Sequence, residues 1–94
     1  MARMALCRVP IEELRQRVTH EARILRAIAC RVRRRDWSNW KIKLWHPAKG
    51  ADVHVQFCDW LVELVPNLDQ EALLRGHKIV KCCQTACRYF DQQS

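Results

Sequence analysis

The sequence is poor in the residues that interrupt regular structure, with only two glycines and three prolines among 94 residues. Long regular elements are therefore expected, because glycine and proline are the usual residues of turns and element ends. No stretch approaches the ~18 consecutive apolar residues that a membrane-spanning helix requires. The apolar patch near the start is also too short for a secretory signal. We therefore expect an intracellular protein, cytoplasmic or nuclear, with no membrane span.

Sequence motifs of catalysis are missing as well. The chain contains no GxSxG, no phosphate-binding loop, no GxGxxG and no HExxH. Two glycines cannot build a loop that cradles phosphates, and the carboxylates are scattered without a spacing that suggests acid–base work. We therefore predict that the protein is not an enzyme and has no catalytic residues.

The six cysteines include no CxxC pair, which argues against a zinc ribbon and against a thioredoxin-type site. In an intracellular protein they are expected to be thiols. His54 with Cys58 and Cys83 with Cys87 form two pairs of nitrogen and sulfur ligands of the kind that zinc binds. In the elements expected below, however, His54 points away from the buried face. We therefore predict no metal and no cofactor, with zinc at this quartet as the alternative.

Positive charge is what the sequence has in excess, since 17 Lys and Arg against 10 Asp and Glu give a net charge of +7. An apolar content of 49% argues against disorder. The length predicts a single small basic domain over 1–94, with 1–9 and 91–94 as flexible ends. The surplus of charge attracts polyanions, which leaves nucleic acid, an acidic protein or anionic lipid as partners.

Two segments have the apolar spacing of amphipathic helices. The first is 10–35, where Pro10 suits the first helical position. The second is 68–90, where Asn67 and Gln70 have the spacing of a capping box. The predicted apolar stripe of the first helix is Ile11, Leu14, Val18, Ala22, Leu25, Ile28, Ala29 and Val32. That of the second is Ala72, Ile79, Val80, Cys83, Ala86, Cys87 and Phe90, with Gly76 where another element approaches.

The middle of the chain, 39–58, alternates apolar and polar residues on both sides of a segment that contains Pro47 and Gly50. Period two on both sides of a turn predicts a β-hairpin. The segment 59–65 is either a third strand or a short helix that ends at Pro66. We therefore predict an α+β fold in which two helices pack on a small antiparallel sheet, with an all-α fold as the alternative.

Arginines cluster on one side of the first predicted helix. At 100° per residue they fall within about a quadrant beside the apolar stripe. Guanidinium groups bind phosphates and keep their charge at any relevant pH. We therefore predict a protein that binds the backbone of RNA or DNA, more specifically RNA or a duplex, without reading the base sequence. The predicted binding residues are Arg15, Arg23, Arg26, Arg33 and Arg34, with Lys41 and Lys43 on the adjoining sheet.

An alternative function is that of a small adaptor or viral-type accessory protein that binds a protein partner or self-associates. A homo-oligomer is expected in either case, because a chain this short gains buried area by association. The apolar stripe of the first helix has heptad-like spacing and is the expected interface. The four tryptophans provide further surface. Trp40 is expected inward and Trp45 outward, where it either stacks on a base or contacts a partner.

Overall fold

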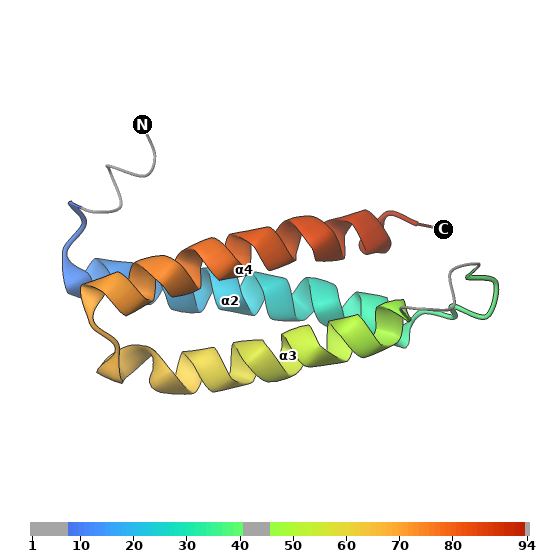
Figure 1. The fold of residues 1–94 in the computed structure, drawn as a ribbon, viewed down its shortest axis with the longest axis horizontal. Coiled ribbons are helices and arrows are strands. Elements are labelled where there is room, and N and C mark those ends of the chain that lie inside the picture. Colours follow the sequence, from blue (N-terminus) through green and yellow to red (C-terminus); the bar gives the residue numbers. More distant parts are fainter. Residues whose placement is uncertain (1–7, 41–45, 94) are drawn as a thin grey trace.

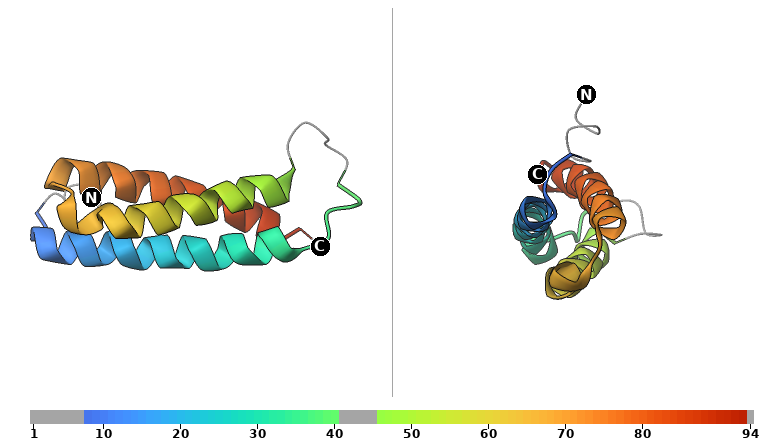
Figure 2. Two further views of the ribbon diagram at one scale, coloured as in Figure 1. Left: turned by 90° about the horizontal axis from the view of Figure 1, so that it is seen from below. Right: turned by 90° about the vertical axis from the view of Figure 1, so that its left-hand side faces the viewer.

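The protein is a bundle of three helices in the computed structural model, which describes residues 8–40 and 46–93 (Figure 1). The helices are α2 (Ile11–Arg34), α3 (Pro47–Leu64) and α4 (Gln70–Asp91), and the 3-10 turn η1 (Val65–Asn67) joins the last two. They run up, down and up, and the end-on view places them at the corners of a triangle (Figure 2). The molecule measures 46 × 28 × 19 Å.

The predicted α+β fold is wrong, because the described residues contain helices and no strand. The residues of the predicted second strand lie in α3, and 59–65 continues that helix into η1. The predicted first strand falls mostly on 41–45, outside the described residues. The all-α alternative is the architecture that the structure has.

The alternation of Val53, Val55 and Phe57 misled the prediction, because it hides a second spacing in the same segment. The residues of α3 that face the core are Ala51, Val55, Cys58, Leu61 and, just beyond it, Val65. Their separations of three and four are those of a helix. Pro47 occupies the first turn of α3, where its missing N–H costs nothing. His46 caps this end through Nδ1, which accepts a hydrogen bond from Ala48 N at 3.1 Å.

The helix predicted over 10–35 is confirmed as α2, and its predicted stripe forms the centre of the core. Only Ile11 in that stripe is exposed, at 38%. Pro10 is the residue before the helix, and no side chain caps this end. α2 packs along the whole length of both neighbours, whereas α3 and α4 contact each other far less. The predicted interface of the first helix is therefore buried inside one chain.

The helix predicted over 68–90 is confirmed as α4, although its cap and its buried face differ from the prediction. Asp69 caps it by accepting a hydrogen bond from Ala72 N at 2.9 Å. The buried residues of this helix are Leu73, Gly76, Val80, Gln84 and Cys87. Ile79, predicted inside, is 49% exposed. Gly76 does face another element, since a Cβ there would lie 3.5 Å from Leu61 Cδ1 of α3.

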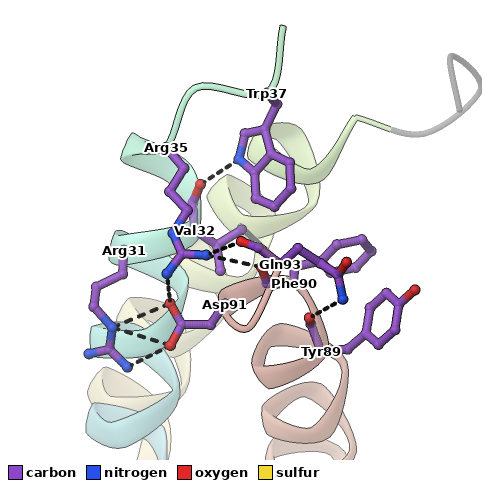
Figure 3. A network of polar contacts seen from close by, with 8 residues as sticks. All are labelled: Arg31, Val32, Arg35, Trp37, Tyr89, Phe90, Asp91 and Gln93. Carbon is purple, nitrogen blue, oxygen red and sulfur yellow. Dashed lines mark hydrogen bonds and ion pairs between the residues drawn. The ribbon is translucent and has the colours of Figure 1, made fainter. Parts of the chain in front are cut away.

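The carboxyl ends of α2 and α4 are joined by ion pairs (Figure 3). Arg31 and Arg35 both bind the carboxylate of Asp91, with N–O distances of 3.1 and 3.2 Å. The Trp37 indole donates a hydrogen bond to Val32 O at 2.8 Å, which satisfies a carbonyl at the end of α2.

Aromatic rings reinforce the same end of the molecule. Trp37, Trp40 and Phe90 contact one another edge to face, with ring centroids 5.4 to 6.1 Å apart. Tyr89 adds a fourth ring at 5.2 Å from Phe90. These contacts fix the start of the connection from α2 to α3.

Among the described residues, no helix has the length and apolar character needed to cross a membrane.

Candidate nucleic-acid interface

The five predicted arginines of α2 do share one side of that helix, and two of them, Arg26 and Arg33, reach α3. Three of them take part in ion pairs within the chain. Arg26 Nε lies 2.7 Å from Asp59 Oδ1, and Arg33 lies 3.0 Å from Asp52 Oδ1. Both carboxylates belong to α3, so these pairs bridge the seam between α2 and α3. The hydrogen bond and the charge of Asp59 raise the pKa of Arg26, which keeps its positive charge.

Arg15 is the most enclosed of the five arginines, with a side chain that is 24% exposed. It pairs with Glu12 one turn earlier, and it donates a hydrogen bond to Leu68 O at 3.3 Å. It therefore ties α2 to the turn before α4. Its Nε is buried and has no hydrogen-bond acceptor among the described residues. Arg15 thus has a structural role that the sequence did not indicate.

Arg23 and Arg34 are exposed, and neither has an ion-pair partner in the ranges 8–40 and 46–93. Among the predicted binding residues that the structure describes, they are the two that form no ion pair with a described carboxylate. Lys41 and Lys43, the other predicted contacts, lie outside the described residues. The structure therefore separates the predicted set into arginines engaged in the fold and arginines open to a ligand.

An open hollow of about 340 Å³ lies beside Arg15 and Arg23. Its wall is formed by one side of α2 and by the turn after α3. Most of the lining residues are of polar type and one is a carboxylate, but the surface that they expose to the hollow is mainly apolar. The residues that line it are Glu12, Arg15, Gln16, Thr19, His20, Arg23, Val65 and Pro66. Its cations are Arg15, which is engaged with Glu12 and Leu68 O, and Arg23.

Charge is distributed unevenly along the bundle. One end is where α2 and α4 finish and α3 begins (Figure 1). The cations of that end are Arg31, Arg33, Arg34, Arg35, Lys49 and Arg88. The carboxylates of that end are Asp36, Asp52 and Asp91. We call it the basic end, since cations outnumber carboxylates there. At the opposite end, the described carboxylates Glu12, Glu13, Glu63, Asp69 and Glu71 are at least as numerous as the described cations Arg8, Arg15, Arg17 and Arg75.

The tryptophans do not follow the predicted hairpin pattern. Trp60 lies in α3 and is 57% exposed, with its ring 6.2 Å from that of Phe57. Trp37 and Trp40 form the aromatic cluster at the basic end. Trp45, predicted to be outward, lies outside the described residues. The sequence did not predict the exposure of Trp60, because the segment 59–65 could be either a strand or a short helix. Without that choice, the buried and exposed sides of the segment could not be assigned.

The histidine and cysteine quartet is arranged differently from the expectation. His54 points toward α4, with its Nδ1 2.8 Å from Cys87 Sγ. Burial lowers the pKa of His54 and raises the pKa of Cys58 to about 12 and that of Cys87 to about 11. The two thiols are therefore protonated at neutral pH and weakly nucleophilic. In the part of the chain that the structure describes, no three or more His, Cys, Asp or Glu side chains are placed to hold a metal ion.

Comparisons with known proteins add no assignment to this geometry. No protein-family model matches the chain. The searches of curated proteins and of solved structures likewise give no significant match. Function is therefore argued from the arrangement of the residues alone.

Proposed function

We propose that this protein binds the phosphate backbone of RNA or of a nucleic-acid duplex along the arginine-bearing side of α2, without reading the base sequence. The observation that supports the proposal best is the row of five arginines on one side of a single rigid helix, with Arg23 and Arg34 unpaired. From Arg15 to Arg34 the row is about 28 Å long at the usual rise of an α-helix. A strand of duplex presents a phosphate about every 3.4 Å along its axis, so several phosphates fall within reach of this row.

The ion pairs along the seam do not prevent phosphate binding. The side chains of Arg26 and Arg33 are 47% and 40% exposed in their pairs with Asp59 and Asp52. Exposed pairs of this kind contribute only about 0–1 kcal/mol, so a phosphate can displace the carboxylate at small cost. The displaced carboxylates remain near the ligand and weaken the attraction. We therefore assign the main phosphate contacts to Arg23 and Arg34, which form no ion pair with the carboxylates that the structure describes.

The test uses fluorescence anisotropy of labelled duplex RNA, duplex DNA and single-stranded RNA at several salt concentrations. Contacts by Arg23 and Arg34 alone would give a slope of log K against log salt of about −1.8 on a duplex, and contacts by all five arginines about −4.5. Replacement of both Arg23 and Arg34 by Gln should reduce the magnitude of that slope by about 1.8. The substitution is compatible with folding, because neither side chain has an ion-pair partner in the described structure.

The matched control replaces Lys78 and Arg88 of α4 by Gln. These residues are also exposed and unpaired in the described ranges, so the control removes the same charge from another side. Equal loss of affinity in both double variants would show attraction by net charge alone and contradict the α2 interface. A triple change of Arg15, Arg26 and Arg33 to Gln would be unsuitable as a test. It removes contacts that join α2 to α3 and to Leu68.

A nucleic-acid partner implies that the protein acts inside the cell, in the cytoplasm or the nucleus. Self-association, expected from the small size of the chain, cannot use the apolar stripe of α2, because that stripe is already buried. A dimer would need another surface.

A further inference from the structure

The outer side of α3 carries a row of exposed residues that we call the outer stripe. Its members are Lys49, Val53, Gln56, Trp60 and Glu63. Their positions differ by four, three, four and three, which is the spacing of a helix seam that meets another helix at a shallow angle. Val53 is 62% exposed and Trp60 57%. Ile79 of α4, 49% exposed, adds a third large apolar side chain that the chain leaves uncovered.

We propose that the outer stripe of α3 is a homodimer interface, in which it packs antiparallel against the same stripe of a second copy. In an antiparallel pair of identical helices, the numbers of facing residues add up to a nearly constant total, which is 112 or 113 for the outer stripe. About a two-fold axis beside Gln56, Val53 faces Trp60 of the second copy, and Lys49 faces Glu63. Each of these contacts occurs twice, as a two-fold interface requires.

The charges at the two ends of the outer stripe favour a second copy of the chain over other partners. Glu63 is the one carboxylate of the ten for which the described structure provides neither an ion pair nor a hydrogen bond. Lys49 has no ion pair there either. They lie about 21 Å apart along α3 at the usual helical rise, too far to meet within one chain. Antiparallel packing places Lys49 beside Glu63 of the second copy, whereas parallel packing would place like charges beside each other.

The centre of the stripe is also complementary to itself. Gln56 donates its side-chain N–H to Asp52 Oδ2 at 3.0 Å, which leaves its amide oxygen able to accept from the second copy. Phe57 lies beside Trp60 and widens the apolar surface toward α4. Aromatic side chains in the centre of an interface usually carry most of its affinity. The arginine row lies on α2, and Asp52, which binds both Gln56 and Arg33, lies at the border between the two surfaces. The dimer does not require nucleic acid.

The test measures the mass of the whole chain by sedimentation equilibrium over a range of protein concentrations, without nucleic acid. The expected mass is twice the 11.2 kDa of one chain. Trp60→Ala should raise the dimer dissociation constant at least about thirtyfold. Lys49→Glu and Glu63→Lys should each raise it about tenfold, because each replaces two opposite-charge contacts by two like-charge contacts. Lys78→Glu, on the outer side of α4, is the control and should leave the mass unchanged.

Mixing the two charge variants makes the test specific for the antiparallel arrangement. In a mixed dimer, the Glu at position 49 of one chain faces the Lys at position 63 of the other, and Glu63 faces Lys49. The mixture should therefore dimerise as tightly as the original chain, although each variant alone does not. A chain that stays monomeric at every concentration, or a dimer that both charge variants and Trp60→Ala leave unchanged, would overturn the proposal. Circular dichroism checks that each variant is folded.

Discussion

Gln84 is the one polar residue in the core of the described structure, with no exposed surface. Its amide donates to the backbone oxygen of Glu21 at 2.9 Å and to the Glu21 carboxylate at 2.8 Å. Burial raises the pKa of Glu21. The hydrogen bonds from Gln84 and Lys81 lower it by more than burial raises it, so the pKa is below its ordinary value. The Glu21 carboxylate is therefore charged at neutral pH and depends on both side chains.

We predict that Gln84→Ala lowers the free energy of unfolding by about 2–4 kcal/mol, because it creates a cavity and removes buried hydrogen bonds. Gln84→Leu keeps the volume and should cost about 1 kcal/mol. Urea unfolding followed by circular dichroism measures both changes. Equal stability of the Ala variant and the original chain would mean that this side chain is not packed as described.

His54 should make stability depend on pH. Burial lowers the pKa of His54 in the folded chain, so the unfolded chain binds the proton more readily. Stability is therefore complete above the ordinary histidine pKa of about 6.5 and falls as the pH drops below it. His54→Gln should reduce the difference between urea midpoints at pH 7.5 and 5.5. His77 has a pKa lowered by burial as well, so part of the dependence should persist. An unchanged pH dependence in the variant would contradict this assignment.

At the scale of the element, Gly76 offers a direct test of how α3 and α4 fit together. A Cβ at this position would lie 3.5 Å from Leu61 Cδ1, an ordinary van der Waals distance. Alanine in a helix interior is favoured over glycine by about 1 kcal/mol. We therefore predict that Gly76→Ala raises the free energy of unfolding by about 0.5–1 kcal/mol, measured in urea. A loss of stability would show that the helices approach more closely than described.

The elements differ in how far the sequence predicts them. The stripes of α2 and α4 are long, so their period is unambiguous. In α3 the run from Val53 to Phe57 satisfies period two over five residues, and Pro47 and Gly50 have the composition of a turn. Pro47 lies in the first turn of α3 and Gly50 is packed within that helix. The same two residue types are also typical of a hairpin turn, so the sequence did not distinguish the two cases. Only the longer row from Ala51 to Val65 distinguishes the two structures.

The candidate site was predictable only in part. The positions of its arginines on α2 followed from the sequence, but their partners on α3 did not. Angular positions along one helix place the five arginines of α2 on one side, and the structure agrees. Which of them are free depends on Asp52 and Asp59, which come from another helix. Asp52 fell in the predicted hairpin turn and Asp59 in the segment left open as a strand or a short helix, so the sequence did not place either carboxylate beside α2. The outer stripe of α3 was hidden for the same reason.

At the scale of the whole molecule, charge and apolar surface occupy different sides. The arginine row follows α2, while the large apolar side chains with the greatest exposure in the described structure lie on α3 and α4. In the proposed antiparallel dimer the two basic ends would lie at opposite poles. Two arginine rows on one particle would allow simultaneous contacts with a long polyanion, and such linked contacts strengthen overall binding. Both proposals can therefore hold together without competing for surface.

The position of α2 between its two neighbours also determines how the domain unfolds. α3 and α4 each rest on α2 and contact each other far less, so neither has a core once α2 is removed. The bundle accordingly contains no smaller folding unit that includes only its last two helices. Loss of α2 is equivalent to global unfolding, which makes the domain a single cooperative unit.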